Sequence, residues 1–85
     1  MGKKPIGKIT RFFNKINVAV VSLSAGMKVG DRILIEGATT SFEQTVDSMQ
    51  VEHENIEAAK KGDMVGLKVK DKVREGDSVY LVTED

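Results

Sequence analysis

A basic–x–Gly–Asp pattern occurs three times in this chain of 85 residues, and each copy is followed by an alternating apolar run. The copies are residues 28–31 (Lys-Val-Gly-Asp), 60–63 (Lys-Lys-Gly-Asp) and 74–77 (Arg-Glu-Gly-Asp). Glycine adopts a positive φ at a turn without steric cost, and aspartate can hydrogen-bond nearby backbone groups. Each copy therefore predicts a turn that leads into a β-strand. The three turns constrain the fold far more than they constrain the function.

Six strands are predicted between turn signals, over residues 6–13, 18–23, 32–36, 42–52, 64–69 and 78–82. The apolar spacing of the first strand is irregular, which predicts a bulge near Gly7. The fourth strand changes face near Asp47 and Ser48, so a second bulge is expected there. Residues 54–60 favour a helix but are too few for more than one turn.

Short strands, frequent turns and little helix are typical of a small barrel. We therefore predict an all-β chain that forms a small closed antiparallel β-barrel of six to seven strands. Closure would leave no edge strand exposed. A chain of this length makes one domain, so residues 1–85 are expected to form a single domain with its core over about 6–83.

The composition excludes several classes of protein. The chain has no cysteine, so it has neither disulfides nor a thiolate metal site. No apolar run approaches the roughly 18 residues that span a bilayer, and neither a signal peptide nor a myristoylation motif is present. We therefore expect a cytoplasmic protein without a membrane partner.

No set of residues typical of catalysis occurs in the sequence. His53 is the only histidine, and its neighbours Glu52 and Glu54 would point away from it in a strand, so a shared metal ion is not predicted. The serines lack a Gly-x-Ser-x-Gly motif, and there is no phosphate-binding loop. A filled barrel of this size also leaves little room for a catalytic cleft. We predict no enzyme, no metal, no cofactor and no nucleotide.

The net charge is zero, but the charges are unevenly distributed. Residues 1–42 have seven Lys and Arg against two acids, whereas residues 43–85 have six against eleven. One interpretation is a basic face for RNA, because basic grooves with aromatic side chains bind RNA in other small barrels. The candidate RNA-binding residues are Lys8, Arg11, Lys15, Lys28 and Arg32. The alternative is that distant strands interleave and mix the two halves. The phenylalanines (Phe12, Phe13 and Phe42) could stack on bases or fill the core, and we favour the core.

The order of these motifs resembles domain II of translational GTPases of the elongation factor Tu type. Residues 61–67 (Lys-Gly-Asp-Met-Val-Gly-Leu) and 73–77 (Val-Arg-Glu-Gly-Asp) are similar to the last strands of that domain. Residues 27–33 (Met-Lys-Val-Gly-Asp-Arg-Ile) and 46–50 (Val-Asp-Ser-Met-Gln) are similar to its earlier segments. The resemblance extends over about residues 6–83 and is closest to the stand-alone elongation-factor-like proteins. A similar barrel forms the end of peptidase-U32-type proteins. These proteins are the second lineage considered.

The resemblance implies a non-enzymatic binding module that contacts ribosomal RNA, transfer RNA or a translation protein. No residue is assigned to the aminoacyl-end pocket, because the pocket residues do not match one by one. The alternative is a protein–protein or structural module that partners a separately encoded enzyme, as the barrel of U32-type proteins implies. The zero net charge favours this alternative, since general RNA binders are usually basic. The sequence predicts no oligomeric state.

Overall fold

The computed structural model describes residues 2–52 and 54–83, and these residues are all-β, with ten strands and no helix. The prediction of an all-β chain is confirmed. The strands are β1 (Gly2–Phe13), β2 (Val18–Leu23), β3 (Met27–Lys28), β4 (Arg32–Glu36), β5 (Ser41–Thr45), β6 (Met49–Val51), β7 (Glu54–Ile56), β8 (Ala58–Ala59), β9 (Met64–Lys68) and β10 (Ser78–Thr83). Across the described part of the chain, no helix has the length and apolar character needed to span a membrane.

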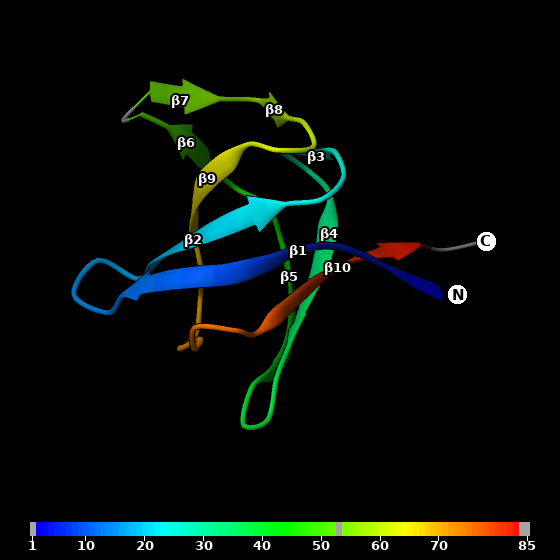
Figure 1. Cartoon of the computed structure of the whole chain (residues 1–85), viewed down its shortest axis with the longest axis vertical. Helices are drawn as coiled ribbons and strands as arrows, with labels where there is room; N and C mark the ends of the chain where they lie inside the picture. Colours follow the sequence, from blue (N-terminus) through cyan, green and yellow to red (C-terminus); the bar gives the residue numbers. More distant parts are fainter. Residues whose placement is uncertain (1, 53, 84–85) are drawn as a thin grey trace.

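Eight strands form one antiparallel sheet in the order β5-β4-β10-β1-β2-β9-β6-β7, and β3 pairs with β8 in a separate ribbon. The sheet curls around a common interior (Figure 1). Its two end strands, β5 and β7, are not paired with each other, so the sheet is not closed. The prediction of a closed barrel therefore goes beyond the observed pairing.

One side chain links the end strand β5 to the chain around the end of β9. The Gln44 Nε2 atom donates to the carbonyl oxygen of Lys68 at 2.9 Å, and the Lys70 N–H donates to Gln44 Oε1, also at 2.9 Å. These strands are not neighbours in the sheet. The amide of Gln44 thus makes two hydrogen bonds between them without any strand pairing.

The three Gly-Asp turns have the same conformation. The φ angles of Gly30, Gly62 and Gly76 are 97°, 94° and 92°. In each turn the aspartate Oδ2 accepts a hydrogen bond from the backbone N–H three residues earlier, at distances of 3.0, 3.1 and 2.8 Å. The aspartate N–H also donates to the carbonyl of that same earlier residue in every copy. The predicted turn chemistry is confirmed at all three positions.

Each turn also binds one buried aliphatic residue that is distant in the sequence. The glycine N–H donates to the carbonyl of that residue, and the N–H of that residue donates to the aspartate carbonyl, with all six distances between 2.7 and 3.0 Å. The residues held are Val46, Leu23 and Ile9 for the first, second and third turn. All three belong to the core. The turns therefore connect strands in addition to starting them.

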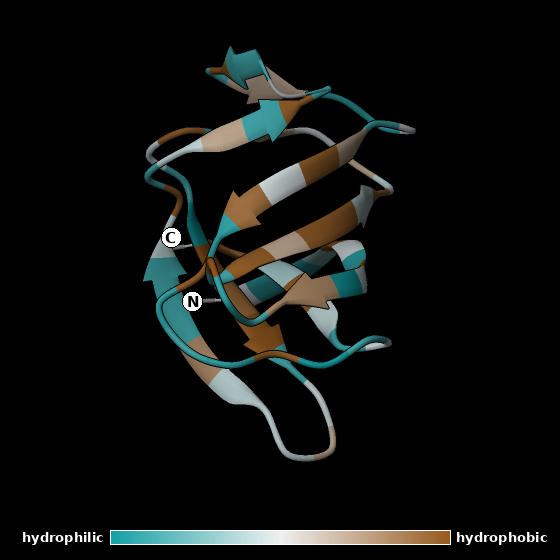
Figure 2. Cartoon of the chain, turned by 90° about the vertical axis from the view of Figure 1, so that its left-hand side faces the viewer, coloured by the Kyte–Doolittle hydropathy of each residue, from teal (hydrophilic) through white to brown (hydrophobic). Residues whose placement is uncertain are grey.

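The core is a single cluster of aliphatic side chains contributed by most strands. Most hydrophobic residues lie on the central strands in Figure 2. The fully buried large side chains are Ile6, Ile9, Val21, Ile33, Ile35, Val46, Met49, Val65, Leu67, Val69 and Val79. Phe12 and Phe42 are half-buried and pack against this cluster, as favoured from the sequence. Phe13 is 43% exposed, so the same expectation is wrong for that residue.

Several predicted strand boundaries need correction. The strand predicted over 42–52 is two strands, because the backbone of Val46 bonds to the turn at Gly30 and Asp31 instead of continuing the ladder with β4. Residues 54–60 form β7 and β8 instead of a helical turn, and β3 was not predicted. The first strand begins at Gly2, because Gly2 pairs with Thr83.

The bulge predicted near Gly7 is confirmed. The register of β1 against β10 shifts between Pro5 and Gly7. A Cβ atom at Gly7 would lie 2.8 Å from both the Ser22 carbonyl oxygen and a Val21 methyl group, so close packing requires glycine there. A second register shift, between Ile9 and Arg11, interrupts the regular pairing of β1 with β2.

Candidate protein-binding surface

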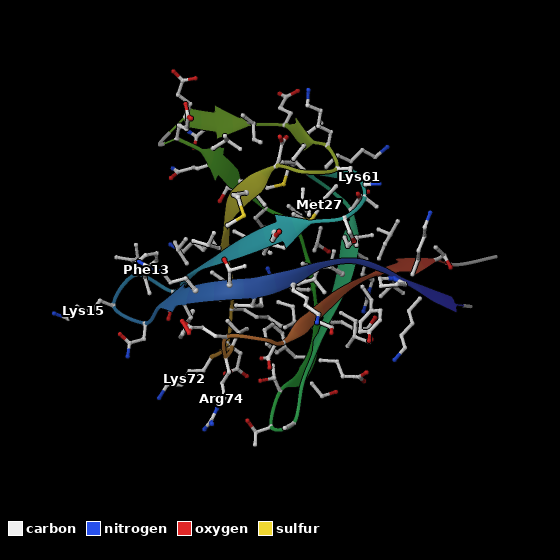
Figure 3. All side chains as sticks on the ribbon, viewed as in Figure 1. Phe13, Lys15, Met27, Lys61, Lys72 and Arg74 are labelled. Atoms are coloured by element: carbon white, nitrogen blue, oxygen red, sulfur yellow. The ribbon has the colours of Figure 1, made fainter. Side chains whose placement is uncertain are left out.

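The five basic residues proposed for RNA binding are exposed, but they lie on different elements. Lys8 and Arg11 are on β1, Lys15 is in the turn after it, Lys28 is on β3 and Arg32 is on β4. Lys15 lies at the tip of the β1–β2 hairpin, on the other side of the molecule from β3 and β4 (Figures 1 and 3). Arg32 also forms an ion pair with Glu43 at 3.2 Å. The structure does not gather all five on one face.

Exposed hydrophobic side chains gather at a different place. Within residues 2–52 and 54–83, the large hydrophobic side chains exposed to solvent are Phe13 (43%), Ile16 (60%), Val29 (40%) and Met64 (50%). Three of these four line a single hollow of about 280 Å³. We call this hollow the outer groove; its lining residues are Phe13, Ile16, Val18, Val20, Gln50, Glu52, Met64 and Gly66.

The outer groove lies on the solvent side of the sheet, over β1, β2, β9 and β6. Along β2, alternate residues from Ala19 to Leu23 are buried in the core, which turns Val18 and Val20 outward. Register places Val18 opposite Phe13 on one side and Val20 opposite Gly66 on the other. Strand β2 is therefore apolar on both faces, although an antiparallel sheet commonly has one polar, solvated face.

Gly66 is at the centre of the outer groove. It lies in the middle of β9 and does not have the positive φ of the turn glycines. A Cβ atom there would be 3.5 Å from a Val18 methyl group and 3.7 Å from the Gln50 carbonyl oxygen, which are ordinary contacts. Neither backbone conformation nor packing within the chain requires glycine at this position.

Three basic residues border the outer groove. Arg11 is opposite Val20, and Lys68 is opposite Val18, so both are next to the apolar residues on the outer face. Lys15 is next to Ile16 in the turn and lies at the same end of the hairpin as Phe13 (Figure 3). Neither of the two ion pairs found in the described part of the chain involves these cations. The border therefore carries more positive than negative charge, with Glu52 as the one acid in the lining.

The described side chains assemble no recognisable catalytic site. No group of three or more metal-ligating side chains comes together in residues 2–52 and 54–83, and His53 lies outside the described residues. A second hollow, of about 420 Å³, is lined by hydroxyl groups at Thr10, Ser22, Ser24 and Ser78, with Lys8 as its one ionisable side chain. It has no histidine or carboxylate to activate a hydroxyl.

Comparison with known proteins connects the chain to peptidases. No family model matches it. It is 48% identical over 83 residues to "Uncharacterized protease MJ0090" of Methanocaldococcus jannaschii, a match of 96% of this chain and 20% of that protein. It is 35% identical over 80 residues to a "Collagenase" of Porphyromonas gingivalis, covering 92% of this chain and 22% of that protein. The chain thus spans about a fifth of the length of these curated relatives.

A solved structure shows the same fold. The C-terminal domain of a Geobacillus thermoleovorans protein assigned to the U32 peptidases superposes with a TM-score of 0.88, covering 94% of this chain and 93% of that domain. The two sequences are 18% identical, so this match establishes the fold alone.

These findings correct the family assignment made from the sequence. The resemblance to elongation-factor-like proteins and to domain II of elongation factor Tu is wrong, because the relatives are a protease and collagenases and the solved fold is a U32 C-terminal domain. RNA binding by the five basic residues is not supported. The fold is that of a U32 C-terminal domain, which agrees in fold with the second lineage considered from the sequence.

The outer groove was not found from the sequence. Its signal was present in the sequence: Val18 and Val20 alternate with Ala19 and Val21, which makes a strand apolar on both faces. Such a run is equally typical of a strand that is covered on both sides within one domain. The structure shows that the second face is uncovered, because Val18 and Val20 are only partly buried and line a surface hollow.

Proposed function

We propose that this chain is a non-catalytic β-domain that acts as an interaction module for a peptidase of the U32 type. The observation that carries the proposal is the match of nearly the whole chain to one fifth of a protein named as a protease, at 48% identity. The same fold occurs as a separate C-terminal domain of a U32 protein, which supports the view that this chain is a domain that folds independently.

Peptidase chemistry is assigned to the part of the relatives that lies outside the match. That part amounts to about four fifths of each relative, given coverages of 20% and 22%. The described residues bring together no group of three or more metal-ligating side chains, and the lining of the hydroxyl-rich hollow has no histidine or carboxylate. Uncovered apolar surface next to basic side chains is instead the kind of surface that binds another protein.

The proposal is tested with the Methanocaldococcus jannaschii protein from which the matching segment has been deleted. This chain is added to the truncated protein, and binding is measured by isothermal titration calorimetry. The deleted segment, added in the same way, is the positive reference. We expect both to bind, because the two segments are 48% identical over 83 residues. Protein hydrolysis by the truncated protein is followed in parallel on casein and gelatin, with and without this chain.

Two results would contradict the proposal. One is that this chain fails to bind although the reference segment binds. The other is that this chain alone hydrolyses casein or gelatin at a rate that persists through successive purification steps. The second result would restore an enzymatic role to the chain.

A further inference from the structure

The outer groove has the composition of an interface centre. Single exposed hydrophobic residues are common on protein surfaces and need no explanation. Here, however, three of the four large exposed hydrophobic side chains in the described residues line the same hollow. They extend the apolar surface formed by Val18 and Val20. Phenylalanine and methionine are enriched in interface centres, where charged residues are depleted. The charged residues Arg11 and Lys68 lie beside the hollow instead of within its lining.

Gly66 adds an independent observation. Glycine in a strand interior lowers stability relative to alanine, because it loses more conformational freedom on folding. Because an alanine Cβ would fit with ordinary contacts, the glycine brings no internal benefit that offsets this cost. Glycine within a strand often marks a place where a ligand or another chain approaches closely. The missing side chain deepens the hollow between Val20 and Gln50, which are its cross-strand neighbours.

The position of the chain ends leaves the outer groove accessible. Gly2 pairs with Thr83, so the two ends of the described chain lie together at one end of the molecule (Figure 1). Phe13 is at the far end of the same strand β1. A linker at either terminus would therefore start at the opposite end of β1 from Phe13.

Charge and shape favour a different protein over a second copy of this chain. In a twofold dimer through this surface, Arg11, Lys15 and Lys68 of both copies would border one shared interface, with one acid, Glu52, in each lining. Like charges placed together across an interface are unfavourable. A hollow also fits a protruding partner better than it fits another hollow.

We propose that the outer groove docks on the catalytic part of a U32-type peptidase, which rests on the function proposed above. The partner surface presents an apolar side chain that enters the hollow over Gly66. Carboxylates on that surface face Arg11 and Lys68. Met64 and Phe13 close the contact on either side.

Oxidation of methionine tests this placement directly. Met64 is 50% exposed, whereas Met27 and Met49 are 2% and 1% exposed and serve as internal references. The chain is treated with dilute hydrogen peroxide alone and in the complex with the truncated Methanocaldococcus jannaschii protein, and sulfoxide formation is followed by mass spectrometry. We expect Met64 to oxidise at least tenfold more slowly in the complex, while both reference residues remain slow.

A fusion in which this chain replaces the matched segment gives the same readout without depending on affinity. Equal oxidation rates of Met64 in the fusion and in the isolated chain would overturn the docking surface, even where calorimetry confirms the function proposed above. Slow, concentration-dependent oxidation of Met64 in the isolated chain would instead show that a second copy covers the groove, which overturns the assigned partner.

Variants test the same surface by affinity. Gly66→Val fills the hollow and Arg11→Glu reverses a border charge, so each is expected to weaken binding at least tenfold. Val29→Ser is the matched control, because among the described residues Val29 is the one large exposed hydrophobic residue outside the groove. It should bind within twofold of the unaltered chain. Unchanged binding by Gly66→Val, with far-ultraviolet circular dichroism showing a folded protein, contradicts the docking surface and leaves the proposed function standing.

Discussion

Replacing the turn glycines with alanine tests how much the repeated Gly-Asp motif contributes to stability. The variants are Gly30→Ala, Gly62→Ala and Gly76→Ala. No atom lies within 4 Å of the Cβ that each substitution adds, so a steric clash with the rest of the protein contributes nothing. The φ angles lie between 92° and 97°, which L-residues with a Cβ rarely adopt. The whole effect therefore comes from backbone conformation.

The expected loss is about 1–2 kcal/mol of unfolding free energy for each variant, which is the approximate cost of a left-handed conformation for a residue with a Cβ. The three values should agree, because the three turns share φ and hydrogen bonding. A domain of 85 residues has a stability of roughly 4–13 kcal/mol. Each single variant should therefore fold, whereas the triple variant should lose about 3–6 kcal/mol if the sites are independent.

Gly66→Ala is the matched control, and it should change stability in the opposite direction. Its φ is not positive and its added Cβ has ordinary contacts, so alanine should stabilise the protein by about 0.5–1 kcal/mol. The measurement is urea unfolding followed by circular dichroism, and the slope against urea should stay constant. Turn variants as stable as the unaltered protein would refute the conformational argument. A Gly66→Ala variant destabilised like the turn variants would refute the distinction between the two kinds of glycine.

Two further predictions concern side-chain hydrogen bonds. Asp77→Ala should lower the free energy of unfolding by about 1–3 kcal/mol. Asp77 is 5% exposed, and its carboxylate accepts a hydrogen bond from the Arg74 N–H at 2.8 Å. Asp31→Ala removes the equivalent hydrogen bond at a more exposed turn, so it should lower the free energy of unfolding by less in the same urea titration. Equal decreases for the two variants would contradict the role of burial. Gln44→Ala should cost about 1–2 kcal/mol by removing two hydrogen bonds, and hydrogen exchange at the Lys70 amide should accelerate. Unchanged exchange there would contradict the link between β5 and β9.

Local features of the fold were predictable because local chemistry determines them. The turn at residues 28–31 depends on a glycine φ and on an aspartate that bonds three residues back, and both follow from the sequence. The bounds of β2 and β4 were also reproduced, since turn signals flank both strands. The break between β5 and β6 was not predictable in the same way. It depends on hydrogen bonds from Val46 to a turn 15 residues away along the chain.

The outward position of Phe13 depends on a bulge whose place is set by pairing. Ile9 is buried and Phe12 is half-buried, yet the two are an odd number of positions apart in the same strand. Regular alternation would place them on opposite faces. The register shift between Ile9 and Arg11 brings both to the core side and sends Phe13 outward. The irregular spacing was visible in the sequence, but the partner strand decides which phenylalanine is exposed.

The incorrect family assignment has a physical cause as well. The Gly-Asp turns hold core residues Ile9, Leu23 and Val46 through backbone hydrogen bonds. This arrangement maintains the scaffold and contributes no group to the outer surface. A pattern that describes only the scaffold can occur in proteins that bind different partners. Matching the turns therefore identified an all-β scaffold and left its partner undetermined.

The glycines inside strands distinguish positions that the fold requires from positions that it does not require, which the turn glycines do not. Gly7 and Gly66 both lie inside strands, in β1 and β9. A Cβ at Gly7 would collide with backbone 2.8 Å away, so the fold itself requires that glycine. A Cβ at Gly66 would collide with nothing, and the residue faces a hollow lined by exposed hydrophobic side chains. If folding were the only constraint, a β-branched residue would serve better at this position, because it packs well on a pleated surface. The absence of a side chain at Gly66 is therefore best explained by a contact that the isolated chain does not make.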